Sequence, residues 1–341
     1  MSTSSLFNTT YQVHRLSPLH VGTRQFTSEV LAHHASHIRD LLTGSTIRGV
    51  RIGLVGTSSE LSKAGALLNV AWTFTSSEQW GVHLNDELDD QQFSGLTLQL
   101  IYERTTYTAL FLRSSSIALE EAWETYPLLL VRMPAHLAST VKAYLESSFD
   151  CKVTQVSFEP KHIISALETY LQDLLGASPT QTTVSRFETL IRDIQLTLSI
   201  NLPSQNGCLK AIELSIPKHD IYQFFQKGQA LADVSSDARF DKMGSGSLLL
   251  AIQHYIKHRM AFDISHSTVQ ISKVACGGFV IGDGRVKIFP PGADEAGVTE
   301  DSELFQWVAT KRKARHHLIE NLFQAARRKN IENTTAVSPV L

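Results

Sequence analysis

The histidines between residues 254 and 266 are the side chains best suited to bind a metal ion. His254 and His258 are four residues apart, which places two imidazoles on one face of a helix, and Asp263 and His266 follow closely. Imidazole and carboxylate groups are common zinc ligands. A cation such as His258 near a helix end also complements the helix dipole. The pattern therefore predicts either a metal enzyme site at His254, His258 and His266 or, more simply, surface histidines at a helix end.

Three further patterns resemble parts of known active sites but lack essential residues. His33 and His37 repeat the four-residue spacing without the glutamate of the HExxH zinc motif. The stretch from Gly53 to Gly56 follows an expected strand but lacks the Lys-Ser/Thr pair of a Walker loop. Cys276 precedes two glycines, which is more typical of a small buried residue before a bulge than of a nucleophile. We therefore expect no enzyme, no cofactor and no resident metal.

The C-terminal part of the sequence is far more basic than the rest. The whole chain has 31 basic and 33 acidic residues, a formal net charge of −2, so no global basicity indicates a nucleic-acid-binding protein. The expected last helix, 303–329, has an apolar stripe and, from residue 311 onward, seven basic residues against one acidic. Such a helix can present cations to DNA or an acidic partner, and a solvated helix face is an equal alternative. The basic residues are Lys311, Arg312, Lys313, Arg315, Arg327, Arg328 and Lys329.

Apolar residues alternate along several segments, which predicts antiparallel β-hairpins with helices packed on them. Residues 96–113 form one expected hairpin, and Asp283-Gly284 between two short strands is the strongest turn signal for another. Three- and four-residue spacing predicts a helix at 160–175, and a short one is expected at 217–225. The fold class is therefore α+β, with mostly antiparallel sheets, helices packed on them and a long basic C-terminal helix.

A polar stretch at 177–185, ASPTQTTVS, is the best candidate for a linker. It predicts an N-terminal lobe at 6–176 and a C-terminal lobe at 186–330, or one continuous domain, followed by a flexible tail at 331–341. No apolar run approaches the roughly 18 residues that span a bilayer, so no membrane segment is expected. The three widely spaced cysteines fit a reducing compartment better than a disulfide scaffold.

Three stretches of the sequence together resemble one protein family. They are residues 6–20 (LFNTTYQVHRLSPLH), 41–74 (with LLTGSTIRGVRIGL and LSKAGALLNVAWTF) and 209–289 (with LKAIELSIPKHDIYQFF and AIQHYIKHRMAFDISHSTVQISKVACGGFVIGDGRVKIF). In these stretches the chain is similar to the centromere protein L (CENP-L) family in its fungal form. The shared features are strand and turn motifs, not catalytic signatures.

The resemblance implies a non-enzymatic inner-kinetochore subunit, located at the centromere in the nucleus, with a curved α+β fold. Family members pair with a centromere protein N homologue inside the constitutive centromere-associated network. That pair contributes to docking on CENP-A nucleosomes and contacts other inner-kinetochore subunits. Partner contact in the family includes pairing at a sheet edge.

The expected C-terminal sheet, with strands near 269–275 and 285–289, is the candidate for such an edge, because a partner strand can add to one. Lysines on an edge strand discourage unwanted pairing in the free state. The sequence leaves open which strand is outermost. The alternative function is a stand-alone DNA-binding protein that uses the basic C-terminal helix. The candidate partner-binding residues are Val269, Ile271, Lys273, Arg285 and Lys287.

Overall fold

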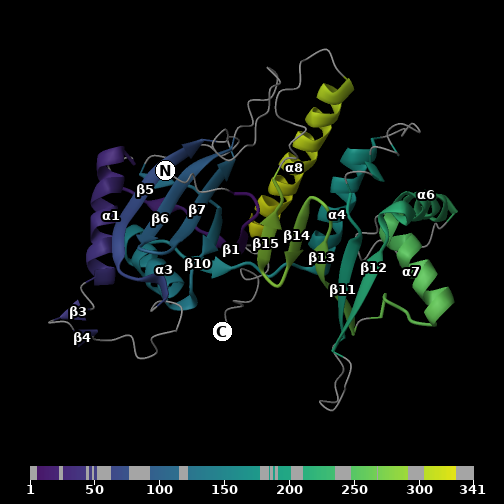
Figure 1. Cartoon of the computed structure of the whole chain (residues 1–341), viewed down its shortest axis with the longest axis horizontal. Coiled ribbons are helices and arrows are strands. Elements are labelled where there is room, and N and C mark those ends of the chain that lie inside the picture. The colour runs from purple at the N-terminus through teal and green to yellow at the C-terminus, as the bar shows by residue number, and fades with distance from the viewer. Residues whose placement is uncertain are drawn as a thin grey trace, which may run out of the picture. The chain divides into compact units, whose positions relative to one another are not determined.

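The computed structural model is an α+β protein in which an antiparallel β-sheet carries helices, as the sequence predicts (Figure 1). Contacts divide it into two compact units, with Thr10–Val156 forming most of the first and Ser157–Ala325 most of the second. Separate folding of lobes 6–176 and 186–330 stays a prediction. The structure describes residues 6–22, 26–43, 46–47, 50–51, 63–76, 93–114, 122–176, 184, 187–188, 191–200, 210–234, 247–266, 268–290 and 303–327, so the tail at 331–341 and the stretch from Gly53 to Gly56 lie outside it.

In its described residues, the first unit is an antiparallel strand array with two helices. Its elements are β1 (Thr10–Leu16), β2 (Leu19–His20), α1 (Ser28–Thr43), β3 (Thr46–Ile47), β4 (Val50–Arg51), β5 (Leu67–Ser76), β6 (Phe93–Tyr102), β7 (Thr106–Ser114), β8 (Trp123–Glu124), β9 (Leu128–Arg132), α3 (Ala135–Phe149) and β10 (Val153–Gln155). The array runs in the order β10-β1-β9-β7-β6-β5. The predicted hairpin of β6 and β7 is confirmed, with Ile101 opposite Thr106.

The core of the first unit lies on the side of the array that the helices cover. Alternate residues of β6, namely Leu96, Leu98 and Leu100, are fully buried, as expected for a strand with one face on a core. The rings of Trp72 on β5 and Phe111 on β7 are stacked, with their centroids 5.5 Å apart. Apolar burial of this kind supplies the main stabilisation of the unit.

The second unit has a second antiparallel array, in the order β12-β11-β13-β14-β15. Helix α4 packs on β13 in this unit. Helix α8 lies along α4, where the imidazole of His317 and the carboxylate of Asp173 are 2.7 Å apart. The elements of the unit are α4 (Pro160–Leu175), β11 (Ile194–Ile200), β12 (Ala211–Ile216), α6 (Lys218–Val234), α7 (Ser247–Met260), β13 (Val269–Ala275), β14 (Phe279–Gly282), β15 (Arg285–Ile288) and α8 (Glu303–Arg327).

The turn between β14 and β15 has the geometry that its sequence predicts. Asp283 and Gly284 both have positive φ, 52° and 69°, as the central residues of a tight two-residue hairpin turn require. Gly282 and Arg285 are therefore opposite each other across the turn.

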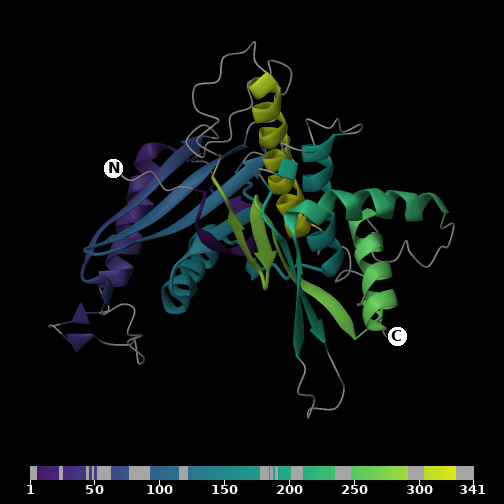
Figure 2. The same cartoon turned by 45° about the vertical axis from the view of Figure 1, so that its right-hand side comes forward.

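Helix α6 is longer than the sequence suggests, because it continues through Gly228 to Val234 instead of ending near Phe225. A glycine inside a helix normally destabilises it. Here α6 and α7 cross (Figure 2), and a Cβ on Gly228 would lie only 1.6 Å from the carbonyl oxygen of Ser247. Gly228 is therefore the residue that permits the close crossing of these two helices.

Candidate partner-binding edge and basic sheet face

The strand β13, which carries three of the five predicted edge residues, lies inside the strand array. It pairs with β11 on one side and with β14 on the other. Val269 and Ile271 are buried, at 7% and 3% exposure, while Lys273 is exposed on a face of the sheet. An edge position does not fit these three residues, because both sides of their backbone already have strand partners. A contact of their side chains with a partner stays a prediction.

Strand β15, which carries Arg285 and Lys287, is at one end of this unit's array. Part of its outer side is taken by the chain itself, since Phe7 forms a parallel bridge with Ile288. The backbone N–H of Asn8 also donates a hydrogen bond to the carbonyl oxygen of Ile288 at 2.7 Å. This strand is therefore not an open edge along its whole length.

Strand β12 is the end strand of this array opposite to β15, and among the described strands it has a neighbour on one side only. Ile212 and Leu214 are half-buried and lie opposite Leu198 and Leu196 of β11. Its one charged residue is Glu213, which is exposed. An end strand with apolar residues and a single acid presents backbone groups that another strand can pair with. The sequence predicts a strand here but not its position at the end of the array, because strand order depends on long-range pairing.

Three of the predicted cations meet on one face of the sheet instead of along an edge. Lys273 lies opposite Gly282, which lies opposite Arg285, so both cations stand in one row across three strands. A Cβ on Gly282 would come within 2.7 Å of the Cβ of Lys273. Glycine at position 282 therefore avoids a steric clash with the Lys273 side chain. Lys287 follows Arg285 by two residues and therefore shares its face.

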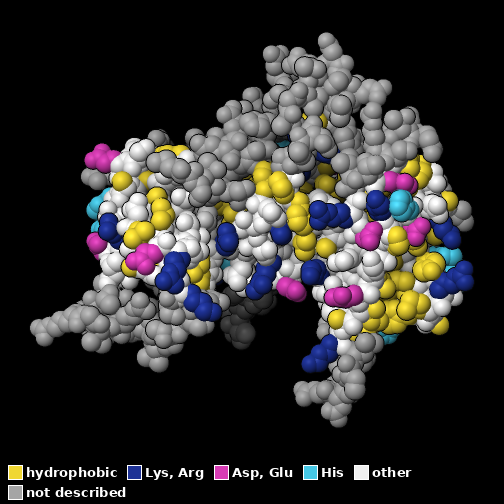
Figure 3. Space-filling view, in the orientation of Figure 1, with side chains coloured by type: hydrophobic (Ala, Val, Ile, Leu, Met, Phe, Trp, Pro, Cys, Tyr) yellow, Lys and Arg dark blue, Asp and Glu magenta, His cyan; other side chains and the backbone are white. Residues whose placement is uncertain are grey.

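An aromatic ring joins this basic face to a cation that sequence analysis did not identify. The ammonium group of Lys287 lies 5.0 Å and the guanidinium of Arg192 lies 5.7 Å from the ring centroid of Phe289. Both distances fit cation–π contact. Figure 3 shows dark blue Lys and Arg side chains spread over the part of the surface where β13 to β15 lie. We call Arg192, Lys273, Arg285 and Lys287 the basic sheet face.

The predicted cations of the last helix differ in accessibility. Lys313 and Arg327 are exposed, and Lys311 and Arg312 are half-buried. Arg315 is only 7% exposed, so its guanidinium belongs to the packed interior of the second unit and not to an open surface. Arg328 and Lys329 lie outside the described residues. DNA or partner binding by this helix stays a prediction.

The alternative metal site at His254, His258 and His266 is not formed. The rings of His254 and His258 are adjacent, with centroids 4.3 Å apart. The Nδ1 atom of His266 instead lies 2.8 Å from the hydroxyl oxygen of Thr268. Asp263 pairs with Lys257 at 3.1 Å. Within the described ranges, no group of three or more His, Cys, Asp or Glu side chains is arranged to hold a metal ion.

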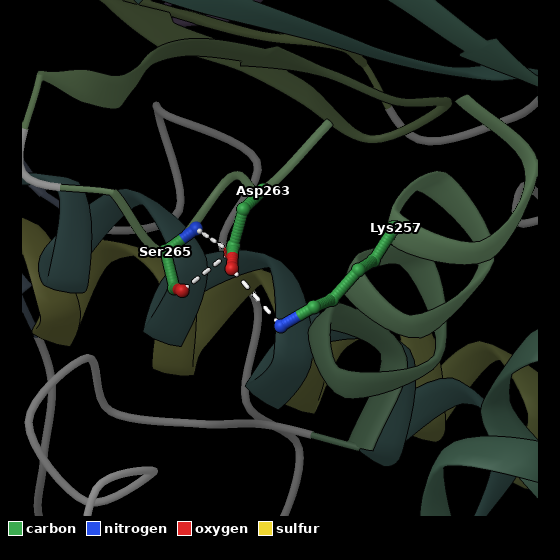
Figure 4. A network of polar contacts seen from close by, with 3 residues as sticks. All are labelled: Lys257, Asp263 and Ser265. Atoms are coloured by element: carbon green, nitrogen blue, oxygen red, sulfur yellow. Dashed lines mark hydrogen bonds and ion pairs between the residues drawn. The ribbon is translucent and has the colours of Figure 1, made fainter. Parts of the chain in front are cut away.

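The carboxylate of Asp263 instead fixes the chain just after α7. It accepts hydrogen bonds from the backbone N–H and the hydroxyl of Ser265, and it pairs with the Lys257 ammonium (Figure 4). These bonds from Ser265 and Lys257 lower the pKa of Asp263 to about 2. The group is therefore charged at neutral pH and serves as a local cap.

Cys276 lies in the interior, as the sequence suggests. Burial raises the pKa of its thiol to about 11, so the reactive thiolate is scarce at neutral pH. Its backbone N–H donates to the carbonyl oxygen of Phe279 at 2.9 Å, which closes the β13–β14 turn. A nucleophilic role does not fit this environment.

The first unit contains a cavity of about 770 Å³ that sequence analysis did not anticipate. Three imidazole and two phenyl side chains make up half of its lining, and a ring nitrogen of His34 lies 2.8 Å from the hydroxyl of Tyr144. Burial first, and then the positive charges of His33 and His37, lower the pKa of His34. Its lining includes His20, Phe26, His33, His34, Ser148 and Phe149.

Comparison with known families gives a match that covers nearly the whole chain. The family model described as centromere protein L matches residues 5–327. No curated protein is matched by this sequence. Over the part of the chain that the structure describes, no helix has both the length and the apolar character needed to cross a membrane.

Proposed function

The chain belongs to the centromere protein L family, and we propose that it is the inner-kinetochore subunit that pairs with a centromere protein N homologue through β12. Membership of this family makes it a protein of the centromere and kinetochore, in the nucleus, from a family of structural components and not of known enzymes. The resulting heterodimer contacts other inner-kinetochore subunits and helps to dock the kinetochore on CENP-A chromatin.

The observation that carries this proposal is the position of β12 at the end of the C-terminal array. A partner strand that pairs with it gains backbone hydrogen bonds along six residues and contacts the half-buried Ile212 and Leu214. The first unit also ends in a strand, β5. We propose β12 because the C-terminal sheet is the candidate edge that the sequence predicts. The array then continues from one protein into the other.

The basic sheet face supports the second part of the proposal, which is docking on chromatin. Lys273, Arg285 and Lys287 present their charges from rigid strands, and Glu213 is the one acid on the described strands of this array. DNA phosphates bind such a surface through charge, without reading base sequence. We propose that this face, within the heterodimer, lies next to nucleosomal or linker DNA.

Stand-alone binding to DNA through α8 is the second candidate function. The observation in its favour is the consecutive run of Lys311, Arg312 and Lys313, of which Lys313 is exposed. Arg315, one of the predicted contacts, is buried and so is less accessible to a phosphate than the other cations. A smaller cationic surface supports weaker binding, so we rank this function below the heterodimer.

Co-expression with the host's centromere protein N homologue, followed by size-exclusion chromatography with light scattering, tests the proposal. We expect one peak with the mass of a one-to-one complex. Leu214→Lys, which places a charge on β12, is expected to weaken the complex by about tenfold or more. The matched control is Val280→Lys, a half-buried apolar residue on the interior strand β14, which should leave the complex intact. Two separate peaks for the wild-type proteins would refute the pairing.

A further inference from the structure

The crossing of α6 and α7 exposes aromatic and apolar side chains that the second unit does not cover. The rings of Phe224 on α6 and Tyr255 on α7 meet edge to face at 5.5 Å. Tyr255 is nevertheless 47% exposed, and Met260 at the end of α7 is 57% exposed. Large apolar side chains exposed together on a folded surface are typical of interaction sites. Figure 3 shows apolar side chains at the right of the molecule, with Lys, Arg and His and some Asp or Glu side chains around them.

The charged residues at this crossing are mostly of one sign. Helix α7 contains no Asp or Glu, and its last turn carries Lys257, His258 and Arg259. Lys227 of α6 is close enough to His254 to act on its ionisation, and burial together with the charges of His258 and Lys227 lowers the pKa of His254. The carboxylate of Asp263 already pairs with the ammonium of Lys257 and accepts a hydrogen bond from Ser265 (Figure 4). An exposed acid, Asp220, lies on α6 one turn before Phe224, so the rim of this surface is mostly, but not wholly, positive.

We propose that this surface, which consists of Phe224, Lys227, Tyr255, Arg259 and Met260 and is called the α6–α7 surface below, binds an acidic amphipathic helix of another protein. The apolar side of such a helix covers Phe224 and Tyr255, and its acidic side faces Lys227 and Arg259. Exposed apolar anchors inside a charged rim are the usual form of a helix-binding site. The proposal concerns a partner other than the strand that pairs with β12, and it does not depend on that pairing.

Two other occupants fit the α6–α7 surface less well. A second copy of this chain in a two-fold arrangement would bring Lys227 and Arg259 of one copy near the same charges of the other, and like charges repel. Duplex DNA would match the cations but would leave Tyr255 and Met260 without apolar partners, because phosphate contacts depend on charge. Both alternatives are outcomes of the test below.

The test measures binding of a fluorescent 18-residue amphipathic peptide, with leucine on one face and glutamate on the other, to the full chain by anisotropy. The comparison peptide has lysine in place of each glutamate. We expect the acidic peptide to bind about tenfold or more tightly than the basic one, and its affinity to fall with added salt. Equal affinity for the two peptides, or no binding of the acidic one, would overturn the proposal.

Surface variants show whether the peptide sits where we propose. Tyr255→Ser and Arg259→Glu should each weaken binding of the acidic peptide by about fivefold to tenfold. Their matched controls are Leu41→Ser, a 48% exposed apolar residue of α1, and Arg132→Glu, an exposed cation of β9, and neither should change it. All four residues are exposed, so their folding can be checked by circular dichroism. Unchanged binding in both test variants, or preferential loss of duplex DNA or anionic vesicle binding in them, would contradict the assignment.

Discussion

The carboxylate of Glu168 on α4 accepts a hydrogen bond from the backbone N–H of Leu249, in the first turn of α7, at 3.0 Å. Ser247, the first residue of α7, has a buried hydroxyl without a hydrogen-bond partner in the described part of the chain. Glu168 therefore takes over the capping of α7 from a helix about eighty residues earlier in the sequence. Sequence analysis assigned no role to Glu168, because nothing local distinguishes it from an ordinary polar residue of α4.

This buried cap makes the stability of the second unit depend on pH. Burial raises the pKa of Glu168 to about 7, and the N–H groups of Leu249 and Leu248 oppose that rise. Because the folded-state pKa lies above the unfolded value, the contribution of Glu168 is greatest below about pH 4.5 and is lost as the pH rises to about 7. The difference amounts to at most about 3 kcal/mol.

Glu168→Gln keeps an oxygen for the bond from Leu249 but cannot ionise. We expect the variant to equal or exceed the wild type in free energy of unfolding at pH 8, and to lose the decline between pH 5 and 7. Glu168→Ala leaves the N–H of Leu249 without its acceptor and should destabilise the chain by about 1–3 kcal/mol at pH 5. The destabilisation should be smaller at pH 8, because alanine also removes the buried charge. Urea unfolding followed by circular dichroism at pH 5 and 8 measures both. A wild-type decline that persists in Glu168→Gln would show that another group is responsible.

Gly228→Ala should destabilise the second unit although alanine is the better helix former. The added Cβ would meet the carbonyl oxygen of Ser247, so α6 and α7 must move apart. Overpacking of this kind costs about 1–3 kcal/mol, more than the gain of about 1 kcal/mol in helix propensity. Gln229→Ala, an exposed neighbour on the same helix, is the control and should be neutral or slightly stabilising. A higher melting temperature for Gly228→Ala would mean that the helices do not cross closely in solution.

Neutralising the basic sheet face should change how DNA binding depends on salt. If Lys273, Arg285 and Lys287 each contact a phosphate, their triple substitution by alanine should reduce the slope of log affinity against log salt by about 3. Lys311, Arg312 and Lys313 are the matched set on α8. Fluorescence anisotropy with a DNA duplex at several salt concentrations measures the slope for both triple alanine variants. If the slope changes only in the Lys311, Arg312 and Lys313 variant, DNA binds α8 and not the basic sheet face.

Local patterns predicted the parts of the fold that depend on neighbouring residues. The Asp283-Gly284 turn and the hairpin of β6 and β7 follow from turn chemistry and alternation, and the structure confirms both. The order of the strands depends on pairing between distant segments, so an interior position for β13 and an end position for β12 could not be inferred. The burial of Arg315 could not be inferred either, because a basic run in a helix does not reveal which of its sides packs inward.

Amide hydrogen exchange of the chain, alone and with the centromere protein N homologue, tests the central claim most directly. We predict that those amides of residues 211–216 in β12 that point away from β11 become protected when the complex forms, because a partner strand accepts hydrogen bonds from them. The amides of β13, which are already paired on both sides, should change little. A stable complex in which β12 exchanges as fast as in the isolated chain, or in which protection appears at β5 instead, would contradict the account.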